Sequence, residues 1–145
     1  MFQRLALTAL HRWGEKEGRK PLVLRGARQV GKTTLVKLFA REFDVFIELN
    51  LEEKENARLF AGEVSFDDLL AGIYAKAGVR MENKRTLIFI DEIQNILRMN
   101  DNAVASKESF ISFMVELSNK TGVGIVSVGT PEVERFFILR KHLER

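Results

Sequence analysis

The eight residues from Gly26 to Thr33, GARQVGKT, constrain the fold of this chain more than any other feature. They fit the pattern G-x-x-x-x-G-K-[ST] of a phosphate-binding loop, which lies between a strand and a helix. Both flanks agree with that placement, because the apolar run 22–24 precedes the loop and the helix-like stretch 34–40 follows it. A chance match in a glycine-containing turn is the alternative, and the flanks make it the weaker one. The motif therefore predicts an α/β fold that binds nucleotide phosphates.

Different residues of the loop suit different parts of a bound triphosphate. The loop bends sharply, and its glycines let backbone N–H groups approach phosphate oxygens. Lys32 can reach the β- and γ-phosphates, the Thr33 hydroxyl can ligate Mg²⁺, and the N-terminus of the next helix adds partial positive charge. We expect the nucleotide to be bound by Gly26, Ala27, Arg28, Gln29, Val30, Gly31, Lys32, Thr33 and Thr34.

An acidic pair supplies the second half of the predicted site. The apolar run 86–90 is typical of a strand buried on both faces of a parallel sheet, and Asp91 and Glu92 follow it directly. Ligands of open α/β sheets bind at the carboxyl ends of the strands. We therefore expect Asp91 to hold Mg²⁺, directly or through water, alongside Thr33, and Glu92 to polarise the attacking water. A surface Asp-Glu pair that merely ends a strand is the alternative.

Two more polar residues follow predicted strands at the same edge. Thr130 is expected to hydrogen-bond the γ-phosphate or the attacking water, and Asn50 to hold Glu92 inactive until a partner or ligand releases it. The alternative for Thr130 is an N-cap, since Pro131 suits the first position of a helix; this role is compatible with the first. The alternative for Asn50 is a turn residue.

Strand-like and helix-like segments alternate along the chain. The predicted strands are 22–25, 45–49, 86–90 and 124–128. The predicted helices are 3–17, 34–43, an exposed 52–60, 65–77, 109–118 and 131–143, with polar connections at 78–85 and 98–106. This alternation predicts one α/β domain over residues 1–145, a three-layer α/β/α sandwich around a parallel sheet.

Composition excludes several classes of function. The chain has no cysteine, which rules out disulfides, thiolate metal sites and cysteine nucleophiles. No apolar run approaches the roughly 18 residues of a membrane span and no signal peptide is visible, so we expect a cytoplasmic protein without membrane insertion. Residues 1–41 carry ten Lys/Arg against two Asp/Glu, a balance that can attract DNA. The alternative is that these charges serve the phosphate loop or are scattered over helix faces.

The phosphate loop, the strand that ends in Asp91-Glu92 and the strand-end Thr130 together resemble an AAA+ ATPase. The segments 21–36 and 89–94 are similar to a prokaryotic AAA+-like group whose members carry this module before a separate C-terminal domain. The segment 128–135 looks closer to the helper ATPases of DNA transposition. The resemblance implies ATP rather than GTP, and an arginine that contacts the neighbouring subunit's γ-phosphate, for which the candidates are Arg135, Arg140 and Arg145.

The resemblance also implies a sheet of order 5-1-4-3-2, in which the fifth strand and a helical lid come after the helix that ends near Arg145. We therefore expect an N-terminal fragment of a longer protein, truncated before both elements, or a chain that completes its sheet from a partner. The strand 22–25 would otherwise be an exposed edge, which invites pairing with a second copy or another protein.

The motifs and the resemblance together support three functions. The leading one is an ATPase module that binds ATP with Mg²⁺, hydrolyses it to ADP and couples hydrolysis to a conformational change. The second is a switch that hydrolyses ATP slowly or not at all and acts through DNA or protein partners. The third is a small-molecule kinase, which is disfavoured because no basic lid for phosphoryl transfer is visible.

Overall fold

The computed structural model describes residues 2–16, 20–25, 31–60, 65–82, 84–97, 103–121 and 123–130. Its centre is a parallel sheet of four strands: β1 (Leu22–Arg25), β2 (Val45–Asn50), β3 (Thr86–Asp91) and β4 (Gly124–Gly129). The strands lie in the order β1-β4-β3-β2, which is the order that the family resemblance implies for these four. Within the described sheet, β1 therefore lies at one end and β2 at the other.

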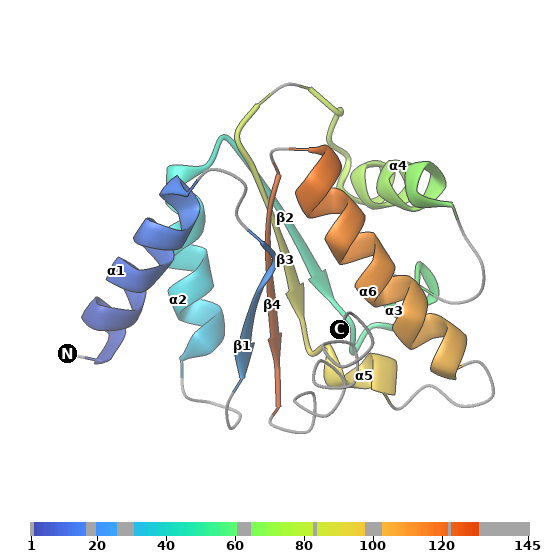
Figure 1. Cartoon of the computed structure of the whole chain (residues 1–145), viewed down its shortest axis with the longest axis horizontal. Coiled ribbons are helices and arrows are strands. Elements are labelled where there is room, and N and C mark those ends of the chain that lie inside the picture. The colour runs from blue at the N-terminus through green and yellow to red at the C-terminus, as the bar shows by residue number, and fades with distance from the viewer. Residues whose placement is uncertain are drawn as a thin grey trace.

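Helices cover both faces of the sheet (Figure 1). One face carries α1 (Phe2–Glu15) and α2 (Lys32–Phe39), which a 3-10 turn (Ala40–Glu42) extends. The other face carries α4 (Phe66–Ala77) and α6 (Ala103–Lys120), together with the short helices α3 (Lys54–Arg58) and α5 (Gln94–Leu97). This arrangement confirms the predicted α/β/α sandwich. In the part of the chain that the structure describes, no helix has the length and apolar character needed to cross a bilayer.

The register of the strands brings their polar ends to one edge. Asn50 at the end of β2 pairs with Asp91 at the end of β3, and Arg25 at the end of β1 pairs with Gly129 at the end of β4. Because all four strands are parallel, the segments that follow them leave the sheet on the same side. Residues that are far apart in the sequence therefore meet at this edge.

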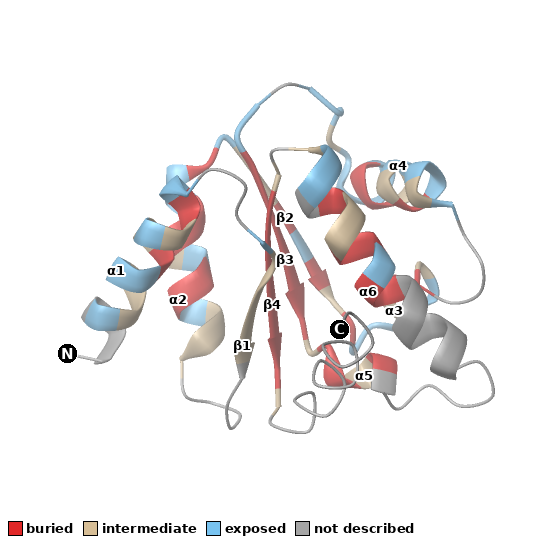
Figure 2. Ribbon diagram, in the orientation of Figure 1, coloured by how far each residue is buried: buried red, intermediate tan, exposed pale blue. Residues whose placement is uncertain are grey.

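Two apolar layers hold the sheet in place, and Figure 2 shows the central strands buried between them. On the α1–α2 face the fully buried Phe39 lies 5.1 Å from the ring of Phe43, measured between ring centroids. On the other face Phe60 stacks on Phe110 at 5.2 Å. Every residue of β3 and β4 is buried, which explains why these strands read as continuous apolar runs.

Three of the observed helices, α3, α5 and α6, differ from the predictions. The helix expected over 52–60 is only α3, and it is not simply exposed, because Asn56 is buried within it and Phe60, just beyond it, packs on Phe110. The loop prediction for 98–106 is wrong for residues 103–106, since α6 begins at Ala103. The short α5 was not predicted. Ile93, just before it, and Ile96 within it are buried, but four residues are too few to show a periodic pattern. The helix predicted at 131–143 lies outside the described residues.

Candidate functional site

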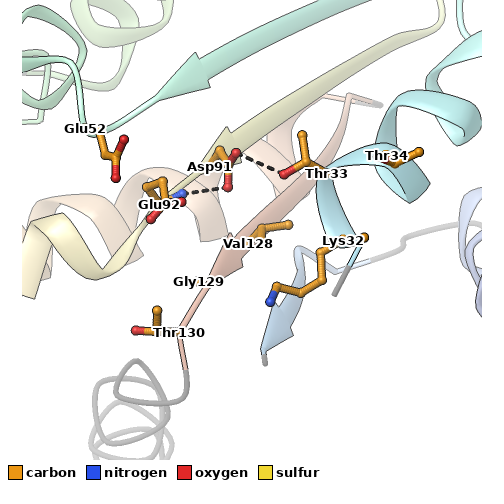
Figure 3. Close-up of a pocket in the computed structure, with 10 residues that line it drawn as sticks. Lys32, Thr33, Thr34, Glu52, Asp91, Glu92, Val128, Gly129 and Thr130 are labelled. Carbon is orange, nitrogen blue, oxygen red and sulfur yellow. Dashed lines mark hydrogen bonds between the residues drawn. The ribbon is translucent and has the colours of Figure 1, made fainter. Parts of the chain in front are cut away.

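A cavity of about 510 Å³ lies at the carboxyl edge of the sheet (Figure 3). Segments that are far apart in the sequence contribute to it: the start of α2, the turn after β2, and the ends of β3 and β4. Its described lining residues are Gly31, Lys32, Thr33, Thr34, Glu52, Asp91, Glu92, Val128, Gly129 and Thr130. This position, outside the ends of the strands, is where open α/β sheets bind their ligands.

The start of α2 forms one wall of the cavity. Gly31 has the left-handed φ of 82° that favours glycine, and its carbonyl oxygen accepts the first helical hydrogen bond from Leu35 N–H at 3.0 Å. Lys32, Thr33 and Thr34 make up the first turn, where the N-terminal end of the helix dipole favours a negatively charged ligand. The remaining predicted phosphate contacts, Gly26, Ala27, Arg28, Gln29 and Val30, lie outside the described residues.

Thr33 and Asp91 meet directly in the cavity, although they are separated by 58 positions in the sequence. The Thr33 hydroxyl donates to Oδ2 of Asp91 at 3.2 Å, and the backbone N–H of Glu92 donates to Oδ1 at 2.9 Å. Asp91 is only 8% exposed. Burial raises its pKa, and the negative charge of Glu92 adds to that effect, while the two hydrogen bonds oppose it.

This pair suits a magnesium ion. A hydroxyl and a carboxylate are the hard oxygen ligands that Mg²⁺ prefers, and a cation would offset the burial of the Asp91 charge. Among the described residues, no group of three or more His, Cys, Asp or Glu could hold a metal ion by itself. The chemistry of the pair therefore fits Mg²⁺ held by one or two protein ligands together with phosphate oxygens.

Glu92 follows Asp91 with a different direction and a strained backbone. Its φ is 59°, and it is the one non-glycine residue of the described chain with a positive φ. The turn is held by Asn95, whose backbone and side-chain N–H groups donate to the Glu92 carbonyl oxygen at 3.1 and 3.0 Å, and by Ile93 N–H, which donates to the Val128 carbonyl oxygen at 3.1 Å. Figure 3 shows the result: the Asp91 carboxylate faces Thr33, and the Glu92 side chain points away from it.

Gln94 is a site residue that the sequence interpretation missed. Its side-chain Nε2 donates to the Glu92 carboxylate, and its Oε1 accepts from the backbone N–H of Thr130 at 3.3 Å. The side chain is fully buried, although it lies outside the described lining of the cavity. The available signal was a polar residue that follows the apolar Ile93 just after Asp91-Glu92.

The end of β2 contributes Glu52, which sequence reasoning also missed. Asn50 forms the turn that places it, because the Asn50 side-chain oxygen accepts from the backbone N–H of Glu52 at 2.9 Å. Glu52 lines the cavity, and Asn50 is not among the described lining residues. The structure therefore gives Asn50 the turn interaction considered as its alternative role, and its action on Glu92 remains a prediction.

The remaining predicted residues divide between the cavity and the undescribed C-terminal segment. Thr130 lies directly after β4 and lines the cavity, as expected from its strand-end position. The helix that it was expected to cap lies outside the described residues, and so do the three arginines proposed to contact a neighbouring subunit: Arg135, Arg140 and Arg145.

Comparison with known proteins leads to the same fold. A family model described as an AAA domain matches residues 18–124. No curated protein matches the sequence.

Among solved structures, the Orc1 protein of Aeropyrum pernix in complex with DNA is similar with a TM-score of 0.59 and 16% identity, over 91% of this chain and 39% of that one. Drosophila ORC bound to DNA is similar with a TM-score of 0.59 and 17% identity, over 91% of this chain and 38% of that one. At these identities the likeness shows the fold, and this chain spans less than two-fifths of the length of either.

Proposed function

The chain belongs to the AAA domain family, and on that basis we propose that it binds ATP with Mg²⁺ and hydrolyses it to ADP to drive a conformational change. One observation carries the proposal. The Thr33 hydroxyl and the Asp91 carboxylate lie 3.2 Å apart at the edge of a parallel sheet, at the start of the helix that follows a phosphate-loop sequence. Together they would form a ligand pair for a nucleotide-bound cation.

The proposed nucleotide site combines the cavity with the loop before it. Residues 26–34 would surround the phosphates, with the Lys32 ammonium on the β- and γ-phosphates and the N-terminus of α2 adding positive charge. The cavity of about 510 Å³ falls in the usual size range of small-molecule sites, about 300–1,000 Å³. Support for ATP rather than GTP comes from family membership.

In this proposal Thr33 and Asp91 hold Mg²⁺, and Glu92 and Thr130 act at the γ-phosphate. Bound Mg²⁺ would neutralise charge on the phosphates. The Glu92 carboxylate would accept a proton from the attacking water, and Thr130 would hydrogen-bond that water or a γ-phosphate oxygen. Supporting the division of roles, Figure 3 shows the two carboxylates of the Asp91-Glu92 pair pointing in different directions.

A switch that hydrolyses ATP slowly is the second candidate, and one observation favours it. The Glu92 carboxylate already accepts a hydrogen bond from Gln94, so the proposed base is engaged by the protein. Such a switch would act through a partner. DNA is one candidate, because the similar Orc1 and ORC structures are bound to DNA and because residues 1–41 are rich in Lys and Arg. A second copy or another protein that pairs with β1 at the end of the described sheet is the other.

Binding and turnover of ATP, measured separately, test the proposal. We expect Lys32→Ala to weaken binding of a fluorescent ATP analogue at least tenfold. Glu92→Gln should keep that affinity and reduce phosphate release about 100-fold, the lower range for loss of a general base. If Glu92→Gln releases phosphate at the wild-type rate, hydrolysis through Glu92 is wrong. If wild-type protein binds ATP and releases no phosphate, with DNA present or absent, the switch is supported instead.

A further inference from the structure

Gln94 is a buried amide with partners on both of the strand ends that the proposed reaction uses. It begins α5, is fully buried, and has the buried Ile93 and Ile96 close to it in the chain. An amide in such a place costs free energy unless its hydrogen bonds are made. Here the Nε2 donates to the Glu92 carboxylate after β3, and the Oε1 accepts from Thr130 N–H after β4.

The backbone around Glu92 is fixed, and the Gln94 amide is a buried donor to its side chain. The strained φ of 59° is fixed by the Asn95 hydrogen bonds to the Glu92 carbonyl oxygen and by the Ile93 bond to Val128. The carboxylate can then move only by rotation of its own side-chain torsions. A hydrogen bond from a buried and immobile donor selects one of these rotamers.

We propose that Gln94 is a positioning residue that fixes the Glu92 carboxylate at the cavity and links its placement to Thr130. The planar Gln94 amide connects the residue after β3, Glu92, with the residue after β4, Thr130. If a bound phosphate displaces Thr130, the Gln94 Nε2 that donates to the Glu92 carboxylate moves with it. This inference rests on the proposed function for what Glu92 does. The linkage itself is a property of the folded protein and can be measured without nucleotide.

Hydrogen exchange of the Thr130 backbone N–H, followed by NMR, tests the linkage directly. Gln94→Met keeps the length of the side chain and removes both hydrogen bonds, so we expect exchange at Thr130 to accelerate about five- to tenfold, the effect of losing one hydrogen bond. Gln94→Glu keeps an acceptor for Thr130 and should retain the wild-type protection. Ser127→Ala, which removes another buried polar group from β4 away from the cavity, should leave Thr130 exchange unchanged.

The second readout is turnover. We expect Gln94→Met to lower kcat about tenfold at unchanged KM and unchanged ATP affinity, because the carboxylate is still present but no longer held. In Gln94→Glu the introduced carboxyl faces the Glu92 carboxylate. The other ionisable groups among the described lining residues of the cavity are Asp91, Glu52 and Lys32. The introduced carboxylate can accept from Thr130 N–H but cannot donate to Glu92, so kcat should fall at least as far as in Gln94→Met while Thr130 keeps its protection.

The two readouts separate failure of this inference from failure of the proposed function. Suppose that the wild-type protein does not hydrolyse ATP but that Thr130 exchange responds to Gln94→Met as described. The linkage between Gln94 and Thr130 is then supported, and the proposed role of Glu92 in hydrolysis is wrong. If a folded Gln94→Met shows wild-type Thr130 exchange, the linkage is wrong. Wild-type kcat in that variant would show that Gln94 does not position Glu92. A raised kcat would show that the hydrogen bond restrains Glu92, as the slow switch requires, and would also overturn the positioning role. Should Gln94→Met not fold, Gln94→Glu decides alone, because it loses the donor to Glu92 and keeps the acceptor for Thr130: wild-type kcat in that variant overturns the proposal.

Discussion

In the layer between α2 and the sheet, Phe39 is buried by neighbours that require only matching volume, whereas at the ends of β3 and β4 each buried group requires a particular partner. Phe39 contacts three other rings, those of His11, Trp13 and Phe43, at centroid distances between 5.1 and 6.1 Å. Asp91 and Gln94 are buried to a similar extent but each depends on specific hydrogen bonds. Burial of the apolar ring stabilises the folded state in the first region. In the second, burial of polar and charged groups destabilises the folded state unless hydrogen bonds compensate for it.

Truncating the apolar layer should have the largest effect on stability. We expect Phe39→Ala to lower the free energy of unfolding by about 3–5 kcal/mol, because it removes a fully buried ring and leaves a cavity. Chemical denaturation measures the change. The matched control is Leu5→Ala on α1, where the side chain is 70% exposed and the change should stay within about 0.5 kcal/mol. A loss below about 1 kcal/mol for Phe39→Ala would mean that this layer is not the stabilising one.

The same contrast explains which parts of the molecule could be predicted from sequence. Apolar runs locate β3 and β4, and Ser65 and Gly78 mark the ends of α4, where Ser65 accepts a capping hydrogen bond from Asp68 N–H at 3.2 Å. These signals are local, so they can be recognised without knowledge of the fold. The helix α5 could not be predicted in this way, because its four residues are too few to show such a signal.

The site was predictable only as far as its motifs extend. Thr33, Asp91 and Thr130 belong to recognisable strand-end and loop patterns, and the structure brings them to one cavity. The role of Gln94 depends on a contact with Thr130, 36 positions away, which exists only once β3 and β4 are neighbours. The left-handed backbone of Glu92 was equally hidden, since glutamate gives no hint of a positive φ.

Two left-handed residues, Gly78 at the end of α4 and Glu92 at the site, allow a sharper test. Gly78 ends α4 with a φ of +70° and has nothing within 4 Å of where a Cβ would stand. Gly78→Ala should therefore destabilise the protein by about 1–2 kcal/mol through backbone strain alone. Thermal unfolding gives the value, and Ala77→Gly in the preceding turn is a control for helix propensity. If Gly78→Ala leaves the free energy of unfolding unchanged, a positive φ costs little in this fold. The proposed backbone strain at Glu92 would then be wrong as well.

At Glu92 the opposite substitution should have the opposite sign. Glu92→Gly removes the side chain from a backbone with a φ of 59°, so we expect the nucleotide-free protein to gain up to about 1 kcal/mol of unfolding free energy. Loss of the Gln94 hydrogen bond works against this gain, and Glu92→Ala reports that loss with the strain still present. The predicted order of stability is Glu92→Gly above Glu92→Ala. The reverse order would mean that the turn is not strained.

The smallest effect expected is a pH-dependent one at Asp91. Its pKa is raised by burial in the folded protein, so the folded state binds a proton more tightly than the unfolded chain, and ionisation costs stability as the pH rises through the folded pKa. Asp91→Asn removes that cost. Its amide oxygen can still accept from Glu92 N–H, and its amide nitrogen can donate to the Thr33 hydroxyl oxygen. The nucleotide-free variant should therefore be more stable than wild type at pH 7, and the difference should vanish below about pH 3, where Asp91 is protonated in both states.

Glu55 supplies a control of opposite sign for that measurement. Its exposed carboxylate has a pKa lowered first by the hydrogen bond and then by the charge of Lys76, so its contribution to stability exists above the unfolded pKa and is lost as the pH falls. Glu55→Gln should therefore lower Tm slightly at pH 7, where Asp91→Asn raises it, and both differences should shrink in acid. If Asp91→Asn lowers Tm at pH 7 without nucleotide, the hydrogen bonds from Thr33 and Glu92 outweigh the burial of the charge. The site would then be preformed for an anion at Asp91 rather than dependent on a cation to stabilise it.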